Sequence, residues 1–377
     1  MTKKKKQKIM FIFGTRPEAI KVAPLIKEFQ KNLENFDVCT ISTGQHKEML
    51  DQVVHFFKIK IDYDLRLMTE NQSLNQLSAK ILISLKDILD KENPEYIFVH
   101  GDTTTTAFAS IAAFYNQIKI CHIEAGLRTF NKYSPFPEEI NRTLTGKLAD
   151  IHFAPTEKAK QNLIIEGVDN NSIEVTGNTV IDALLNGVEI SKTYNDKQID
   201  FLNNIILENK KIILVTGHRR ENFGAGFQNI CDALTEISDN KDIQIIYPVH
   251  LNPNVKNVVH KMLGHISNIH LIEPLNYPAF TWLMNKSYII LTDSGGVQEE
   301  APSLGVPVLV MRNNTERPEG VTAKTAILVG TDKEKIVQNV NRLLFEKIHY
   351  EKISLNENPY GDGTASKKIV NYMIKNG

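Results

Sequence analysis

Three acidic side chains in the first half of the chain have the type and spacing that proton transfer needs. Asp102 and Glu124 each end a short apolar run, and Glu138 lies in the proline-bounded stretch 135–142. Carboxylates that converge on one place push their pKa values apart, so that one can accept a proton while another donates it. The set therefore predicts general acid and base catalysis, although each residue alone is more often a surface group or a helix cap.

Residues in the second half favour a nucleoside diphosphate. Ser294, Gly295 and Gly296 follow an apolar run and open a helical segment, so free backbone N–H groups and the helix dipole would face an anion. Glu300 lies about one turn further on, where a carboxylate can accept from both hydroxyls of a ribose. Arg317 adds a guanidinium for phosphate. The combination is more specific than any of its parts.

A glycine turn also opens the first helical segment, at residues 14–21. Arg16 could contact phosphate there, and an ordinary strand-to-helix turn with exposed charges is equally compatible. Neither GxGxxG nor GxxxxGK[ST] occurs, so the sequence predicts no dinucleotide fingerprint and no P-loop. His218 follows another apolar run and is the histidine best placed for work in a cleft.

Strands of parallel sheets must position these clusters. Short β-branched apolar runs, polar turns and helical segments alternate along the chain, which is typical of parallel sheets covered on both faces. Ligands bind beyond the carboxyl ends of such strands. The expected strands are residues 8–13, 38–43, 96–100, 119–124, 151–155, 172–176, 211–216, 242–248, 268–272, 288–292 and 307–311, and the expected helices include 17–31, 104–115, 227–237 and 279–285.

The alternation restarts near residue 210, which predicts an α/β protein with two doubly wound Rossmann-like domains and a cleft between them. We expect the first domain, with the carboxylates, at residues 1–190 and a linker at 191–209. The second domain, which would bind the diphosphate, is expected at 210–360. Residues 361–377 are expected to form a C-terminal helix that packs back on the first domain.

The composition argues against several classes of protein. The chain has 377 residues, and its 44 basic residues balance 44 acidic ones, so nothing attracts nucleic acid or an anionic membrane. No stretch approaches the roughly 20 apolar residues of a membrane span. Cys39, Cys121 and Cys231 are far apart, which favours buried thiols over disulfides or zinc. We expect a soluble, cytoplasmic protein that binds neither nucleic acid nor membrane.

In this order the clusters resemble those of the non-hydrolysing bacterial UDP-N-acetylglucosamine 2-epimerases. The resemblance extends from about residue 8 to residue 370. The matching stretches are residues 13–21 (FGTRPEAIK), 100–105 (HGDTTT), 124–129 (EAGLRT), 177–182 (GNTVID), 217–222 (GHRREN), 248–253 (PVHLNP), 292–296 (TDSGG), 317–320 (RPEG) and 358–363 (NPYGDG).

The resemblance implies a GT-B-like fold, interconversion of UDP-GlcNAc and UDP-ManNAc without cofactor or metal, a homodimer, and supply of ManNAc for surface polysaccharide synthesis. It implies catalytic roles for Asp102, Glu124, Glu138 and His218. It implies substrate binding by Arg16, Lys21, Phe280 (near the uracil), Ser294, Gly295, Gly296, Glu300 and Arg317.

The implied chemistry fits these residue types. As UDP leaves C1, positive charge grows on the sugar ring and the C2 proton becomes removable by a carboxylate. The product is a 2-acetamidoglucal with UDP still bound, and UDP adds back after a proton reaches C2 from the other face. This scheme needs a base, an acid on the opposite face and a clamp for the diphosphate. The sequence does not divide the acid and base roles among the carboxylates.

Other functions stay open on the sequence alone. A glycosyltransferase of the same fold would share the nucleotide site but need an acceptor, and a hydrolysing 2-epimerase would release free ManNAc and UDP. A nucleotide-sugar sensor would tolerate the loss of Asp102 or Glu138. Turnover in Asp102→Asn and Glu138→Gln separates these classes, since a sensor has no activity to lose.

Allosteric activation by a second UDP-GlcNAc also stays open. Gln45, Arg219 and His250 match positions associated with such a site in some members of the family. Glu48 and the segment around Asn71 look less like the regulated members.

Overall fold

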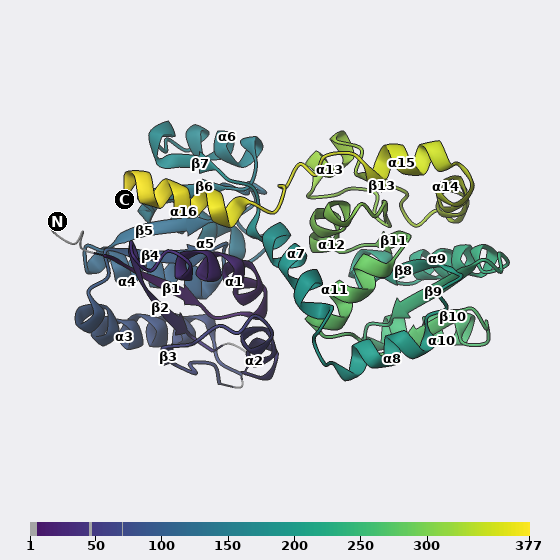
Figure 1. Ribbon diagram of the computed structural model, residues 1–377, viewed down its shortest axis with the longest axis horizontal. Helices are drawn as coiled ribbons and strands as arrows, with labels where there is room; N and C mark the ends of the chain where they lie inside the picture. The colour runs from purple at the N-terminus through teal and green to yellow at the C-terminus, as the bar shows by residue number, and fades with distance from the viewer. Residues whose placement is uncertain (1–5, 45–46, 70) are drawn as a thin grey trace. The chain divides into compact units, whose positions relative to one another are not determined.

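The computed structural model describes residues 6–44, 47–69 and 71–377. The chain forms two compact units, one running up to Ala183 and including Gly361–Gly377, the other comprising Leu184–Tyr360 (Figure 1). The division falls inside helix α7 (Thr179–Ser191). Residues 197–205, within the segment expected as a linker, form helix α8 of the second unit.

The first unit contains, in its described residues, one sheet of seven parallel strands in the order β3-β2-β1-β4-β5-β6-β7. The strands are β1 (Gln7–Phe13), β2 (Phe36–Ser42), β3 (Tyr63–Asp64), β4 (Tyr96–His100), β5 (Lys119–Ile123), β6 (Ile151–Ala154) and β7 (Ile173–Val175). The helices are α1 (Arg16–Gln30), α2 (Lys47–Phe56), α3 (Leu74–Glu92), α4 (Thr104–Tyr115), α5 (Glu138–Leu148), α6 (Glu157–Ile165), the start of α7, and α16 (Ala365–Asn376).

Alternate residues of each strand serve opposite faces of this sheet. Met10 and Ile12 of β1 belong to a core cluster with α3 and α4. Phe11 points the other way, stacks on Phe98 of β4 and meets Phe29 of α1 edge-on. A strand buried on both faces must be apolar at every position, which is why β1 reads as a continuous hydrophobic run.

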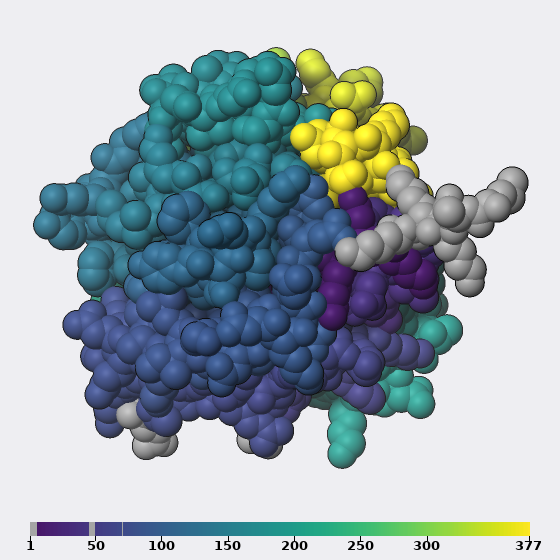
Figure 2. Space-filling model, turned by 90° about the vertical axis from the view of Figure 1, so that its left-hand side faces the viewer, coloured from purple at the N-terminus to yellow at the C-terminus, as the bar shows by residue number. Residues whose placement is uncertain are grey.

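The C-terminal helix belongs to the first unit. Helix α16 packs against α1, as the yellow segment beside the purple one shows in Figures 1 and 2. Its Tyr372 meets the ring of Phe153 edge-on, with 5.6 Å between centroids. The carboxylate of Asp182 accepts the backbone N–H groups of Ala365 and Ser366 and so caps the helix.

The second unit contains, within the described chain, six parallel strands in the order β10-β9-β8-β11-β12-β13. The strands are β8 (Lys211–Thr216), β9 (Ile243–Pro248), β10 (Ile269–Ile272), β11 (Ile289–Thr292), β12 (Val308–Val310) and β13 (Ala326–Leu328). The helices are the end of α7, α8 (Lys197–Ile205), α9 (Ala225–Ile237), α10 (Pro253–Leu263), α11 (Tyr277–Lys286), α12 (Gly295–Glu300), α13 (Pro318–Thr322), α14 (Lys333–Phe345) and α15 (Lys347–Ser354).

Both faces of the second sheet are also covered. Ile213 and Val215 of β8 pack in one cluster with α9, α10 and α14. Ile212 and Leu214 pack in another with α8 and α11. The same alternation therefore builds both sheets from continuous apolar runs.

The predicted fold class, two doubly wound α/β units, is confirmed. Each expected strand is present with ends within two residues, and the edge strands β3 and β13 were not foreseen because two or three residues show no periodicity. The three cysteines are buried and free. None of the helices in the described ranges is long and apolar enough to cross a membrane.

One topological feature recurs in both sheets. Strand β1 pairs with both β2 and β4, and strand β8 pairs with both β9 and β11. The chain reverses its direction across the sheet at each of these places. Ligands of open α/β sheets bind beyond the carboxyl ends of strands at such switch points.

Candidate active site

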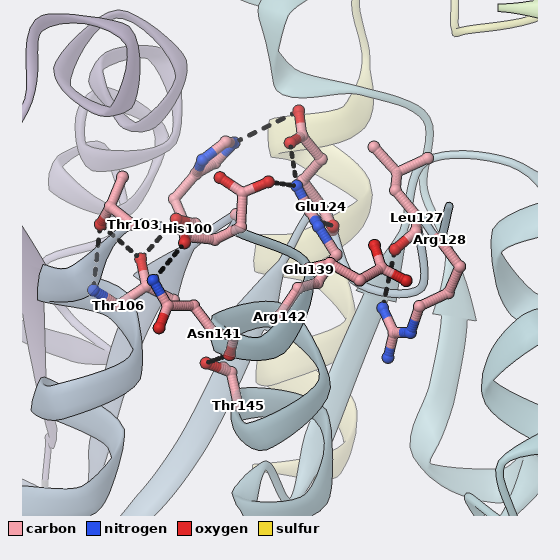
Figure 3. A network of polar contacts seen from close by, with 12 residues as sticks. His100, Thr103, Thr106, Glu124, Leu127, Arg128, Glu139, Asn141, Arg142 and Thr145 are labelled. Carbon is pink, nitrogen blue, oxygen red and sulfur yellow. Dashed lines mark hydrogen bonds and ion pairs between the residues drawn. The ribbon is translucent and has the colours of Figure 1, made fainter. Parts of the chain in front are cut away.

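In the first unit, one arginine holds the carboxylates that follow β4 and β5. Nη2 of Arg142, from α5, donates to Oδ2 of Asp102 at 2.5 Å and to Oε1 of Glu124 at 3.2 Å. Its Nη1 donates to the Glu124 backbone carbonyl, and Figure 3 shows the guanidinium pointing at Glu124. The structure thus brings together two of the three predicted carboxylates.

Several hydrogen-bond donors compensate the negative charge of the Glu124 carboxylate. Its Oε2 accepts from Nζ of Lys21 and from Nδ2 of Asn178, the latter at 3.1 Å, while Nε2 of His100 lies 3.8 Å away. Burial by itself raises the pKa of Glu124, but Lys21, His100 and Arg142 together hold it well below its usual range. Glu124 therefore stays ionised despite its burial.

The two bridged carboxylates differ in access to solvent. The side chain of Asp102 is 30% exposed and that of Glu124 is 7% exposed. Nδ2 of Asn141 donates to the backbone carbonyl of Asp102 at 3.0 Å and ties its turn to α5. Of the two, Asp102 is the carboxylate that a ligand can reach directly.

Glu138 stands apart from this pair. It is the first residue of α5, and its half-buried carboxylate makes no hydrogen bond or ion pair within the described part of the chain. The buried carboxylate of Glu139 instead accepts the backbone N–H groups of Thr129 and Phe130. Since Glu138 precedes Arg142 by one helical turn, both lie on the same face of α5.

The turn after β1 forms as its sequence predicts. Thr15 caps α1 and exchanges hydrogen bonds with Glu18 in a capping box. Arg16, the first residue of α1, is half-buried. Lys21, which the resemblance places near the substrate, pairs with Glu124. Lys21 thus links α1 to the carboxylate that follows β5.

In the second unit, Asp293 joins the ends of β8 and β11. Its buried Oδ2 accepts the backbone N–H groups of His218 and Arg219, both at 2.9 Å, and Nδ1 of His218 lies 3.2 Å from Oδ1. Burial raises the pKa of Asp293, but the hydrogen bonds from His218 and Arg219 outweigh it and leave the pKa lowered. Asp293 thereby fixes the ring of His218, whose side chain is 46% exposed.

Two arginines flank the start of α12. A Cβ added at Gly295 would lie 3.9 Å from Nη2 of Arg219 and 4.0 Å from Cζ of Arg317. Nε of Arg219 donates to the backbone carbonyl of Asp293 at 3.0 Å. Ser294 occupies the N-cap position without a side-chain cap bond. The helix therefore begins between two guanidinium groups.

The remaining residues predicted for UDP binding lie in or near core elements of the same unit. Arg317 pairs with Glu299, the residue before Glu300. Glu300, the last residue of α12, is half-buried, and its Oε2 lies 3.8 Å from the position of a Cβ at Gly296. Phe280 of α11 packs, partly buried, against the core of this unit.

Two of the three residues associated with allosteric activation line one pocket with His218. The pocket has a volume of about 500 Å³, and the rings of His218 and His250 stack within it at 5.6 Å between centroids. Its lining is His218, Arg219, Arg220, Glu221, His250 and Asn252. Gln45 lies outside the described residues.

Sequence reasoning gave no role to three residues that organise these sites. Asp293 directly follows the expected strand 288–292, which is a signal that could have found it. Arg142 stands one turn after Glu138 on an expected helix start, a weaker signal. Asn178 lies in the matching stretch 177–182, but no local pattern shows its bond to Glu124, which spans 54 residues of sequence.

Comparison with known proteins decides the family. A family model described as UDP-N-acetylglucosamine 2-epimerase matches residues 27–374. The chain belongs to the UDP-N-acetylglucosamine 2-epimerase family. As a member of this family the chain is an isomerase.

Relatives of the same name cover nearly the whole chain. The UDP-N-acetylglucosamine 2-epimerase of Campylobacter jejuni is 54% identical over 376 residues, 98% of either chain. That of Escherichia coli K12 is 54% identical over 373 residues, covering 98% of this chain and 99% of its own. The crystal structure of UDP-GlcNAc 2-epimerase from Neisseria meningitidis bound to UDP-GlcNAc shares 50% identity, with a TM-score of 0.86 over 98% of this chain and 100% of that one. The GT-B-like fold that the resemblance implies is that of the family's solved structures.

Proposed function

We propose that this member of the 2-epimerase family catalyses the reversible conversion of UDP-GlcNAc to UDP-ManNAc by elimination and re-addition of UDP through a 2-acetamidoglucal. The observation that carries the proposal is the Arg142 bridge between Asp102 and Glu124 at the carboxyl ends of β4 and β5. The relatives' names, and the UDP-GlcNAc bound in the Neisseria structure, supply the substrate class.

In this proposal the carboxylates of the first unit carry out proton transfer at C2. Asp102 is accessible and is held in place by Arg142, so it takes the C2 proton of UDP-GlcNAc as UDP departs. Glu138 begins α5, on the same helix face as Arg142, and has no ion-pair partner in the described residues, so it serves as the second carboxyl group and delivers a proton to the other face of C2. Glu124, held ionised by Lys21 and Arg142, stabilises the positive charge that grows on the ring. In the reverse direction Asp102 and Glu138 exchange roles.

Residues of the second unit bind the diphosphate in this proposal. The backbone N–H groups at Gly295 and Gly296 and the guanidinium of Arg317 hold the departing UDP, with Arg219 beside them. Ser294 caps the same helix start, Glu300 accepts from the ribose, and Phe280 contacts the uracil. His218, whose Nδ1 faces Asp293, donates a hydrogen bond from Nε2 to the diphosphate in its imidazolium form as the charge of the diphosphate grows. Arg16 adds a phosphate contact from the first unit.

The proposal extends to assembly and cell biology through family resemblance. It includes a cytoplasmic homodimer that needs neither cofactor nor metal and supplies ManNAc for surface polysaccharide synthesis. Sedimentation of the purified protein at working concentration tests the dimer, and a monomer would remove that part of the proposal.

Identification of the product by NMR tests the reaction. The purified protein is incubated with UDP-GlcNAc alone, and proton and phosphorus spectra follow the sugar and the diphosphate. A stable mixture of UDP-GlcNAc and UDP-ManNAc is the expected result. Free ManNAc with UDP would assign the chain to hydrolysis. An unchanged spectrum from folded protein that binds UDP would contradict the proposal.

The division of the two proton-transfer roles has its own test. With UDP-GlcNAc, the Glu138→Gln variant can still eliminate UDP but cannot complete C2 protonation, so 2-acetamidoglucal and UDP should accumulate. Asp102→Asn should accumulate neither. With UDP-ManNAc as substrate the pattern should reverse. The same behaviour of both variants with both substrates would overturn this assignment while leaving epimerisation intact.

A further inference from the structure

Glu18 is a buried carboxylate at the switch point of the first sheet that the proposed mechanism does not use. Its side chain is 2% exposed. Oε2 accepts the backbone N–H groups of Gly14 at 3.0 Å and Thr15 at 2.7 Å. Oε1 accepts the hydroxyl hydrogen of Thr103 at 2.7 Å. One carboxylate thus binds donors from two separate turns.

These contacts join the turn after β1 to the turn after β4. Glu18 and Thr103 are 85 residues apart in sequence, although their strands are neighbours in the sheet. The hydroxyl of Thr106 lies 3.1 Å from the same Oε1 and also donates to the His100 carbonyl at 2.6 Å. The hydrogen bonds therefore continue from α1 into both ends of the turn that carries Asp102.

A second contact lies beside the first. The hydroxyls of Thr43, after β2, and Thr105, in α4, are 2.8 Å apart. A Cβ at Gly14 would lie 2.2 Å from the Thr43 hydroxyl oxygen and 2.5 Å from that of Thr105. The absence of a side chain at Gly14 lets the three turns approach this closely, so the region around Glu18 is tightly packed.

Helix capping alone does not account for Glu18. Helix α3 has a capping box of the same kind, in which the side chain of Gln76 bonds, among the residues that the structure describes, to Ser73 of its own cap alone. Glu18 performs that local function at Thr15 and in addition accepts from Thr103 and lies within reach of Thr106. The additional partners lie in the β4–α4 segment.

Both ends of this connection lead to the proposed catalytic carboxylates. Thr103 directly follows Asp102. Lys21, one turn beyond Glu18 on α1, donates to Glu124. Any shift of α1 against the turn after β4 would therefore change the separation of Asp102 from the pair formed by Lys21 and Glu124.

We propose that Glu18 is a positioning residue for the C2 proton transfer. It holds the turn that carries Asp102 in register with α1, so that Asp102 and Glu124 keep the separation that the reaction requires, and it does not touch the substrate. This inference rests on the proposed epimerase function. Misplacement of a reacting group by about 1 Å can cost about 100-fold in rate.

Replacement of Glu18 by glutamine tests the inference. The variant keeps the size of the side chain but places an NH2 group where a donor from one of the two turns needs an acceptor. Asp182→Asn is the matched control, because Asp182 is a buried carboxylate that accepts two backbone N–H groups, those of Ala365 and Ser366, far from the turn after β4 in sequence. For wild type and both variants we would measure kcat and KM for epimerisation, the Kd of UDP, and the midpoint of unfolding.

The expected result is a specific loss of kcat. Glu18→Gln should lower kcat about 10- to 100-fold while KM and the Kd of UDP stay within about threefold. Asp182→Asn should keep kcat within about threefold of the wild-type value, even if its unfolding midpoint falls as far as that of Glu18→Gln. Thr103→Val, which removes the partner hydroxyl, should share the kcat defect of Glu18→Gln, and Thr103→Ser should restore it. The variants Thr103→Val and Thr103→Ser test the inference by themselves if Glu18→Gln does not fold.

Other outcomes would overturn the inference. Wild-type kcat in both Glu18→Gln and Thr103→Val would show that the connection has no part in catalysis. Equal kcat losses in Glu18→Gln and Asp182→Asn at matched unfolding midpoints would show a structural role only. An inactive wild-type protein would overturn the proposed function and this inference together, whereas active variants of an active enzyme would overturn this inference alone.

Discussion

The switch points of the two sheets bury their arginines to different degrees. In the first unit, Asp102 and Glu124 share Arg142, whose side chain is only 6% exposed. In the second unit, Arg219 and Arg317 stand at the start of α12 with side chains 28% and 25% exposed. Both sites pair their arginines with carboxylates, but the second site, with the pairs Arg219–Glu316 and Arg317–Glu299, keeps its cations partly in water.

This difference matches the two tasks of the proposed reaction. Proton transfer needs groups fixed to within a fraction of an ångström, and buried, mutually paired charges provide that rigidity. A diphosphate that leaves and returns needs cations that it can reach without a large desolvation cost. Breaking a buried pair is expensive, and losing an exposed one costs little. The comparison therefore predicts different responses to mutation in the two units.

Removal of Arg142 should have the largest effect. Arg142→Ala leaves two carboxylates without their shared cation, so the free energy of unfolding should fall by about 3–5 kcal/mol. The value of kcat should fall by about 1,000-fold or more. Arg142→Lys keeps the charge without the fork and should be intermediate. Urea denaturation and NMR rate measurements check both effects.

Arg219→Ala is the contrasting variant in the second unit. Its ion pair with Glu316, which is 50% exposed, should contribute about 1 kcal/mol or less to the free energy of unfolding. The Kd of UDP should rise about tenfold, since a charge-assisted contact is lost. A destabilisation as large as that of Arg142→Ala would erase the distinction between the two sites.

Loss of the accessible carboxylate should separate catalysis from binding. Asp102→Asn should lower kcat by about 100- to 10,000-fold, the range for general acid and base groups, because the amide cannot accept the C2 proton. The Kd of UDP should stay within about threefold, as the diphosphate is assigned to the other unit. Calorimetric titration with UDP and NMR turnover measure the two quantities. Full turnover in this variant would exclude Asp102 as the base.

Two glycine substitutions should affect different properties. Gly14→Ala would place a methyl group 2.2 Å from the Thr43 hydroxyl oxygen, so the free energy of unfolding should fall by about 1–3 kcal/mol. Gly295→Ala meets nothing closer than 3.9 Å and should fold as well as wild type. Its methyl group would nevertheless obstruct a diphosphate between the two arginines and raise the Kd of UDP. Thermal melts and UDP titration give both readouts, and a destabilised Gly295→Ala with unchanged UDP binding would contradict the assignment.

A pH dependence of stability is expected in the first unit. Burial lowers the pKa of His100 and His152 to about 4, compared with about 6.5 in an unfolded chain. Between these values the unfolded state binds more protons, so stability is complete above about pH 6.5. It falls toward pH 4 by up to about 1.4 kcal/mol per pH unit for each histidine. Asp293, whose pKa is lowered, loses its contribution only below about pH 4.

Urea midpoints at pH 7.5 and pH 5 measure this dependence. His152→Asn should reduce the difference between the two midpoints. Equal midpoints for the wild type at both pH values would show that these histidines do not titrate as their burial requires.

The fold and the location of the candidate site could be predicted from the sequence. The apolar runs of the parallel sheets predict the strands clearly, and Thr15, a residue type that caps helices, predicts where α1 begins. Because parallel strands end at the same edge, the positions of Asp102 and Glu124 after two strands placed them together before their contacts were known.

The partners within the site could not be predicted, because they are distant in sequence. Arg142 reaches Asp102 across 40 residues, and Lys21 reaches Glu124 across 103. A pattern in one segment carries no information about such pairs. The resemblance assigned Lys21 to the substrate side without its bond to Glu124, and the connecting role of Glu18 depends on a contact with Thr103 that no local motif describes.

Isotope exchange at C2 of the substrate tests the central claim most directly. The wild-type protein is incubated with UDP-GlcNAc in D2O, and proton NMR follows the C2 hydrogen of both epimers. The proton that Glu138 delivers comes from a partly exposed carboxyl group that exchanges with solvent, so UDP-ManNAc should form with deuterium at C2. Asp102 is also accessible to solvent, so a proton that it removes should exchange and the remaining UDP-GlcNAc should gain deuterium as well. UDP-ManNAc that forms with its C2 hydrogen retained would contradict proton transfer by these carboxylates.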